Sequence, residues 1–291
     1  MAEQLSLFFK ETTSTIDNKE EKVKALDELF AQSARYQNSA EFLALLEFIN
    51  RFPGLSPYNA FLVNMQDSAA SIVLSPHRWK KYGRQVKPYA RPFIILVPFG
   101  PVEFVYDISD TEPINGEEDN IPQELTNPYE TKGYLDPSIF HTTCHNADKE
   151  GITCGDYKMQ RASAGYVMTQ AQDRFLININ TEYEINEKYS TLVHELAHVY
   201  CGHLGRNKKS WWESRKNLSN ESKEFEAESV SFLVCKRHGL TTTSHQYLSD
   251  YVTKNATLPA ISIETILTVS NHIEKMGLKG FKVKGGAGVK I

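Results

Sequence analysis

Residues 190–203 read STLVHELAHVYCGH, which places His194 and His198 four residues apart with Glu195 directly after the first histidine. In a helix, side chains four residues apart lie on one face, so the two imidazoles can reach the same point. Imidazole nitrogens bind Zn²⁺, and an adjacent glutamate can take a proton from a water molecule on the metal. This HExxH pattern predicts a metal site that activates water for hydrolysis.

The apolar residues around the histidines favour a metal site over an ordinary buried helix. If residues 185–203 form a helix, Leu192, Leu196 and Val199 share one stripe and the histidines fall on nearly the opposite stripe. The second stripe is also flanked by apolar or aromatic residues, namely Val193, Ala197 and Tyr200. Imidazoles on a buried face need partners, because unpaired polar groups are costly there. A shared metal ion is such a partner.

Catalytic zinc usually has three protein ligands and an open position, so a third ligand is needed. Cys201 shares the histidine stripe, but it lies roughly 10 Å along the axis from His194 and is too far to hold the same ion. In the next predicted helix, 221–238, Glu226 continues an apolar stripe of Val230, Leu233 and Val234. A carboxylate on an apolar face is unexpected for a surface charge. We therefore expect Glu226 to be the third ligand, with Glu224 and Glu228 as alternatives that also fit as exposed first-turn acids.

Two other groups of potential ligands fit known templates less well. His203 would point to the opposite side of a continued helix, and although Gly202 can end the helix, the spacing HExxHxxGxxH is not met. The segment HTTCHNADKEGITC, 141–154, contains two histidines and two cysteines. It allows a second metal site, but its spacing matches no zinc-finger template.

The predicted constellation is His194, His198 and Glu226 on zinc, with Glu195 as general base. Zinc lowers the pKa of its water ligand toward neutrality and polarises a peptide carbonyl. The ligand types favour Zn²⁺, and Mn²⁺ or another divalent ion is also compatible. Spacing does not identify the group that stabilises the oxyanion, for which the candidates are Tyr166, His245 and Tyr251.

Hydrophobic periodicity predicts an α+β protein in two parts. Helices are expected at 20–35, 40–51 and 58–66, followed by strands in SIVLS, PFIILVPF and VEFVYDI. The polar, acidic segment 107–126 predicts a linker, so we expect domains at 1–125 and 126–291. The second domain is expected to be mainly helical with a small sheet. Its strands lie in AGYVMT and RFLININ, and its helices at about 185–203, 221–238, 243–254 and 259–276.

Composition is that of an ordinary globular protein. The 291 residues are 41% hydrophobic and 23% charged, with a net charge of −4. We expect no membrane partner, because no apolar run is long enough to cross a bilayer and no secretory leader is visible. The four cysteines form no CxxC pair, which favours reduced thiols and a cytoplasmic location.

A local basic stretch contrasts with this negative net charge. No acidic residue occurs from Ser68 to Val102, and within that range RWKKYGRQVKPYAR, 78–91, holds six lysines or arginines. Cations follow phosphates and aromatic rings stack on unpaired bases, so we expect single-stranded DNA to bind here. The predicted DNA-binding residues are Arg78, Trp79, Lys80, Lys81, Tyr82, Arg84, Lys87 and Arg91. The alternative is a solvated basic turn whose aromatic residues anchor it to the core. A second basic and aromatic stretch, 206–216, joins the two helices of the metal site.

Two segments carry a family resemblance. TLVHELAHVYCGHLG (191–205) and EFEAESVSFLVCKRHGL (224–240) resemble the ImmA/IrrE-type zinc metallopeptidase domain, and within that group are most similar to the ArdC antirestriction proteins. The N-terminal segment 56–99, followed by EFVYDISDTE, resembles the ArdC N-terminal domain, so the likeness covers about residues 40–255. It implies a single-stranded-DNA-binding domain, a zinc-peptidase-like domain and a role in protecting mobile DNA from restriction. Carried over by position, the metal ligands fall on His194, His198 and Glu226.

Two functions follow from these expectations. The first is a zinc-dependent peptidase that hydrolyses a protein or peptide substrate and also binds single-stranded DNA. The second is a non-catalytic, DNA-binding antirestriction protein whose metal site is structural or vestigial. Glu195 favours the first, because a structural metal site has no need of a general base.

Overall fold

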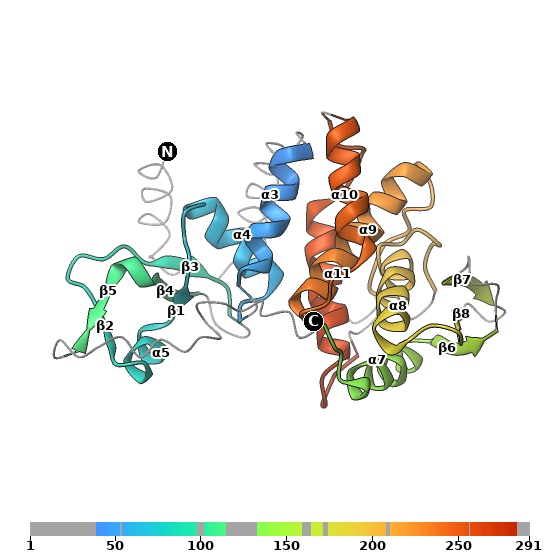
Figure 1. Ribbon diagram of the computed structural model, residues 1–291, viewed down its shortest axis with the longest axis horizontal. Coiled ribbons are helices and arrows are strands. Elements are labelled where there is room, and N and C mark those ends of the chain that lie inside the picture. The colour runs from blue at the N-terminus through green and yellow to red at the C-terminus, as the bar shows by residue number, and fades with distance from the viewer. Residues whose placement is uncertain are drawn as a thin grey trace.

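The computed structural model describes residues 39–52, 54–97, 102–114, 133–158, 164–170, 174–207, 210–255 and 257–283. These residues form a mixed α and β protein, as expected, in which small sheets lie on either side of a helical centre (Figure 1). The helix expected at 20–35 lies outside the described residues. Among the described helices, none combines the length and the apolarity that a membrane crossing requires.

The N-terminal part begins with helices α3 (Ser39–Asn50) and α4 (Pro57–Gln66). The Ser56 side chain caps α4 by accepting a hydrogen bond from the Asn59 N–H at 3.2 Å, and Pro57 fits the first turn, where no backbone donor is needed. There follow β1 (Val73–Leu74), α5 (Pro76–Lys81), β2 (Arg84–Val86), β3 (Phe93–Ile95), β4 (Glu103–Asp107), the short 3-10 turn η2 (Ile108–Asp110) and β5 (Thr111–Pro113). The strands pair antiparallel in the order β1-β4-β3, with β2 on β5.

Buried polar side chains attach the basic stretch to these small sheets. Trp79 of α5 is completely buried, and its indole Nε1–H donates to the Tyr106 carbonyl at 2.9 Å. Arg84 of β2 is also buried and donates through Nε and Nη2 to the Thr111 side chain and carbonyl. Both side chains therefore hold the basic stretch on the β4 and β5 strands.

The C-terminal part contains the third described sheet and the longest helices. It comprises α7 (Pro137–Lys149), β6 (Ile152–Tyr157), β7 (Gly165–Gln170), β8 (Arg174–Asn180), α8 (Ile185–Tyr200), α9 (Asn220–Arg237), α10 (Thr243–Lys254) and α11 (Ile263–Met276). The strand order is β6-β8-β7, with β6 parallel and β7 antiparallel to β8. Strand β7 is therefore an edge strand, and it packs on α8.

Helix α9 lies at the centre of the helical core. It contacts α8, α10, α11 and α3, and most of its residues are buried. The N-terminal helices belong to the same core, because Phe42 of α3 packs on Phe225 of α9 with ring centroids 5.6 Å apart. Arg237 of α9 also donates to the Phe52 and Leu55 carbonyls at 3.1 and 2.7 Å. The expected boundary at 125/126 lies outside the described residues, and α3 and α4 pack with the helices that follow it (Figure 1).

Candidate metal centre

Helix α8 carries the HExxH residues and is defined at both ends by its sequence. At its start, the Glu187 side chain accepts from the Glu184 N–H at 3.0 Å and completes a capping box. The helix ends after Tyr200, where Gly202 adopts a φ of +76°. The expected stripe of Leu192, Leu196 and Val199 is fully buried, so the opposite side of α8 turns His194 and His198 toward α9.

The two histidines and Glu224 converge on one point. The Nε2 atoms of His194 and His198 are 3.1 Å apart. Oε2 of Glu224 lies 3.6 Å from Nε2 of His194, and Oε1 lies 3.6 Å from Nε2 of His198. Two nitrogens that bind one zinc ion at about 2.0–2.1 Å in tetrahedral geometry lie about 3.3 Å apart. The donor set fits a divalent ion, and because the Glu224 side chain is 50% exposed, the site is open to water and substrate on that side.

The other ring nitrogens of the histidines also have polar partners. Glu228 lies one turn after Glu224 on α9, with its Oε1 atom 3.6 Å from Nδ1 of His194. Nδ1 of His198 lies 3.0 Å from Nδ1 of His203. Partners at Nδ1 leave Nε2 free to bind a metal and hold each ring in position.

The charges at this site favour an ionised third ligand. The adjacent imidazoles of His194 and His198 hold the pKa of Glu224 well below its usual range. Burial alone would lower the pKa of His194, but Glu224, Glu228 and Glu195 raise it. An ionised carboxylate next to two imidazoles is a donor set that zinc and manganese both accept.

Glu195 lies between the histidines and the edge of the small sheet. Burial raises the pKa of its carboxyl group, an effect that the nearby His194 and His198 partly offset. The carboxylate also accepts a backbone hydrogen bond from Val167 of β7. A candidate general base thus lies beside the outer edge of β7, where Tyr166 and Met168 are exposed.

The structure does not bring Glu226 to the histidine pair. Its fully buried carboxylate accepts from Nη1 and Nη2 of Arg215 at 2.6 and 2.5 Å, from Nε2 of His203 at 2.9 Å and from the Ser262 N–H at 2.6 Å. The expectation that Glu226 faces the two histidines is therefore wrong, and Glu224, one of the two alternatives from the sequence, faces them instead. The apolar stripe did indicate a buried carboxylate, but an arginine and a histidine, not the metal pair, are its partners.

The remaining candidates from the sequence are dispersed. Cys201 is buried in the core as a small apolar residue, and burial raises the pKa of its thiol. Cys144 and Cys154 contact each other, but residues 141–154 contribute no metal-binding group within the described ranges.

Two candidates for the group that stabilises the oxyanion have other partners. Tyr251 donates to Glu221 at 3.1 Å and His245 lies 3.5 Å from Glu47. Tyr247 of α10 was not among the residues proposed from the sequence to stabilise the oxyanion, although it lies close to the site. Burial raises its pKa, and so do the charges of Glu224 and Glu228.

The predicted DNA-binding residues divide by exposure. Trp79 and Arg84 are buried, so neither can contact DNA, and the alternative of an aromatic anchor is correct for Trp79. Tyr82 is half-buried, whereas the other five side chains are exposed: Arg78, Lys80, Lys81, Lys87 and Arg91. Tyr89, the third aromatic residue of the stretch, is exposed and adopts a φ of +67°. Phe104, which is 51% exposed on β4, was not expected from the sequence.

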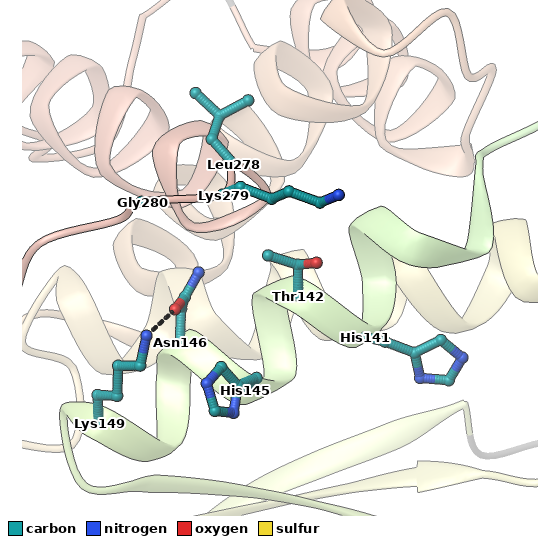
Figure 2. A pocket seen from close by; sticks show the side chains of 8 residues that line it. All are labelled: His141, Thr142, His145, Asn146, Lys149, Leu278, Lys279 and Gly280. Atoms are coloured by element: carbon teal, nitrogen blue, oxygen red, sulfur yellow. Dashed lines mark hydrogen bonds between the residues drawn. The ribbon is translucent and has the colours of Figure 1, made fainter.

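A pocket of about 420 Å³ lies on a different part of the molecule, between α7 and the end of α11 (Figure 2). Its lining includes His141, His145, Lys149 and Lys279, and Lys149 donates to Asn146 at 2.7 Å. None of its lining residues is acidic, and among the described residues its two histidines belong to no group of side chains close enough to share a metal ion.

Comparison with known proteins gives a sequence relative and structural neighbours. An uncharacterized protein of Bacillus anthracis, pXO2-81, is 26% identical over 288 residues, and the match spans 81% of this chain but 47% of the relative. This chain thus spans about half the length of that curated relative. No family model matches.

Two of the structural neighbours are the Mn(II)-bound and metal-free crystal structures of the antirestriction protein ArdC from plasmid R388. Both are 14% identical to this chain, with TM-scores of 0.33 and 0.34. They cover 76% and 75% of this chain, and 84% and 81% of their own chains. TM-scores of this size do not establish a shared fold, so the site is interpreted from its own geometry.

Proposed function

We propose that this protein is a metal-dependent hydrolase that cleaves peptide bonds. The observation that carries the proposal is the convergence of the His194 and His198 Nε2 atoms and the Glu224 carboxylate, with Glu195 adjacent. When bound, a divalent ion, Zn²⁺ or Mn²⁺, supplies Lewis acidity to the carbonyl and the attacking water. Glu195 accepts the proton of that water at its carboxylate and can return it to the leaving amine.

A peptide is the proposed substrate because of the edge strand beside Glu195. The outer edge of β7 pairs with no other strand of the described sheet. An extended peptide could add to it through backbone hydrogen bonds, as strands do at exposed sheet edges. Because Glu195 already contacts the Val167 N–H, a peptide bound there would pass the general base.

The metal centre is tested by removing the carboxylate that faces both histidines. Protein purified without added metal is expected to contain about one divalent ion per chain. Glu224→Ala should lose that ion while keeping its fold, because Glu224 is half exposed and is not part of the core. The measurement is metal analysis together with circular dichroism.

The matched control for this experiment is Glu221→Ala, which removes an exposed carboxylate one turn earlier on α9. It should retain the metal. Full metal content in Glu224→Ala, or equal loss in both variants, would place the ion elsewhere.

A second function, binding of single-stranded DNA by the N-terminal part, is also proposed. It is supported by the five exposed cations of the basic stretch and by the exposed rings of Tyr89 and Phe104. Segment 56–99 also resembles the ArdC N-terminal domain in sequence. Together these features favour a DNA-binding part within residues 1–125 and a role in antirestriction on mobile DNA. The hydrolase would then lie within 126–291, and the free cysteines suit a cytoplasmic location. If hydrolysis is absent, DNA binding remains as the alternative function.

Reversing the charges of Lys80, Lys81 and Arg91 is expected to weaken binding to a fluorescent oligo(dT) strand by more than about tenfold and to flatten its salt dependence. The slope of log affinity against log salt is negative, and each lost phosphate contact should reduce its magnitude by about 0.7. Fluorescence anisotropy across a salt series measures both quantities. Arg84 is left intact because it is buried.

The control for this experiment reverses Lys254, Lys275 and Lys279, which are exposed on other elements and give the same change in net charge. Its affinity should fall much less. Equal losses of affinity in the two triple variants would indicate non-specific electrostatic attraction and would contradict DNA binding at the basic stretch.

A further inference from the structure

His203 reaches His198 because the chain turns back after α8. Gly202 has a φ of +76°, and a Cβ atom there would lie 2.0 Å from the Glu213 carbonyl oxygen, so only glycine fits. The His203 N–H then donates to the His198 carbonyl at 3.0 Å. A continued helix would have directed this ring to the other side, whereas the glycine turn brings the two rings to a centroid distance of 5.1 Å.

The hydrogen bonds of His203 form a chain with one consistent direction. Nδ1 of His203 lies 3.0 Å from Nδ1 of His198, and its Nε2 lies 2.9 Å from Oε2 of Glu226. An imidazole that binds a metal through Nε2 carries its proton on Nδ1. His198 must then donate to His203, which accepts at Nδ1 and donates from Nε2 to Glu226.

Glu226 is held as the acceptor at the end of this chain. Its two oxygens receive four donors, two from Arg215, one from His203 and one from the Ser262 backbone. The Arg215 guanidinium balances its charge in an environment where the carboxylate is completely buried. The acceptor is therefore fixed in both position and charge before any metal binds.

A competing interpretation is a second metal site, because Cys201, His203 and Glu226 also lie close enough to share an ion. The oxygens of Glu226 are already engaged by four donors, and the adjacent guanidinium would repel a cation. The thiol of Cys201 is also buried among core residues. These contacts fit an orienting role better than ligation.

We propose that His203 is a positioning residue of the metal centre, which holds His198 in the tautomer and orientation that bind metal through Nε2, while Glu226 and Arg215 fix His203. This inference rests on the proposed metal centre at His194, His198 and Glu224. His203 itself does not touch the metal or the substrate.

The test compares His203→Leu, His203→Asn and His272→Leu. The leucine at 203 removes both hydrogen bonds, whereas the asparagine oxygen can take the place of Nδ1 and accept from His198 without reaching Glu226. His272 is the matched control, because it is equally buried and its Nε2 contacts the buried Glu150 at the same distance of 2.9 Å, but it lies on α11 and does not contact His198. Zn²⁺ affinity is measured by competition with a chromophoric chelator, and the stability of each metal-free variant by thermal unfolding.

The expected result is a 10–100-fold weaker Zn²⁺ affinity for His203→Leu, the range typical of lost partners of metal ligands. His203→Asn should recover part of the affinity although it still lacks the Glu226 bond, and His272→Leu should bind Zn²⁺ normally despite any loss of stability. Unchanged Zn²⁺ affinity in folded His203→Leu would overturn the positioning role of His203 without contradicting the proposed metal centre. Absence of Zn²⁺ binding in the wild type would overturn both.

Discussion

Replacing Glu195 with glutamine is expected to slow peptide hydrolysis by about 10²–10⁴-fold, the usual contribution of a general base. Glutamine keeps the size of the side chain and can still accept from the Val167 N–H, but it cannot take a proton from water. Burial raises the pKa of Glu195, which makes its carboxylate a stronger base than an exposed glutamate. The measurement is the rate of cleavage of unstructured peptides, with metal content determined on the same samples.

Glu182→Gln is a suitable control, because it makes the same substitution at an exposed glutamate shortly before α8. It should cleave at the wild-type rate, and Glu195→Gln should retain its metal. Wild-type cleavage by Glu195→Gln would remove Glu195 from the mechanism. If hydrolysis is lost while DNA protection in restriction assays is intact, the protective function belongs to DNA binding and not to the hydrolase.

Local patterns in the sequence were sufficient to predict the elements that carry the candidate site. The helix expected at 185–203 is confirmed as α8, which ends at Tyr200, and the helix expected at 221–238 is confirmed as α9, because both follow from apolar periodicity. The spacing of His194 and His198 also predicted their convergence, which depends only on the geometry of one helix. Helix α7 and strand β6 were not predicted, because the segment 141–157 is polar and its histidines and cysteines were interpreted as possible metal ligands.

The third ligand depends on how two helices pack, which periodicity does not specify. Helix α9 is surrounded by other helices, so a buried position on it does not indicate which neighbour it faces. Glu224 faces α8, whereas Glu226, two residues later, faces Arg215 and His203. The loop that carries Arg215 and the turn at Gly202 bring the partners of Glu226 into place. Neither segment has a sequence pattern that predicts a contact with Glu226.

The basic stretch shows the same limit at the level of single residues. Its composition correctly indicated a set of exposed cations, but it did not reveal which members point inward. Arg84 and Gln85 are consecutive in β2, and the pleat of the strand buries the first and exposes the second. Trp79 is buried because α5 packs its single large apolar side chain against β4, where the Tyr106 carbonyl accepts from the indole.

Glu226→Gln is expected to reduce the free energy of unfolding by about 3–5 kcal/mol, the cost of leaving one member of a buried ion pair without its partner. Glutamine offers one oxygen and an NH₂ group where the carboxylate accepted four donors, so the Arg215 guanidinium would face a donor. The bonds from His203 and Ser262 would weaken as well. Urea unfolding of the metal-free protein measures the loss.

Glu224→Gln is the matched control, because the same substitution is made two residues earlier on the same helix at a half-exposed side chain. It should change the unfolding free energy of the metal-free protein by less than about 1 kcal/mol, because charge pairs at exposed side chains are screened by solvent and contribute little. Adding Zn²⁺ should then stabilise the wild type more than Glu224→Gln, because an ion that binds the folded state selectively raises its stability. Equal instability of the two metal-free variants would contradict the assignment of Glu226 to the fold and Glu224 to the metal. A loss of stability in Glu226→Gln alone, with a weaker response to Zn²⁺ in Glu224→Gln, would reverse the roles that the sequence favoured for these two glutamates.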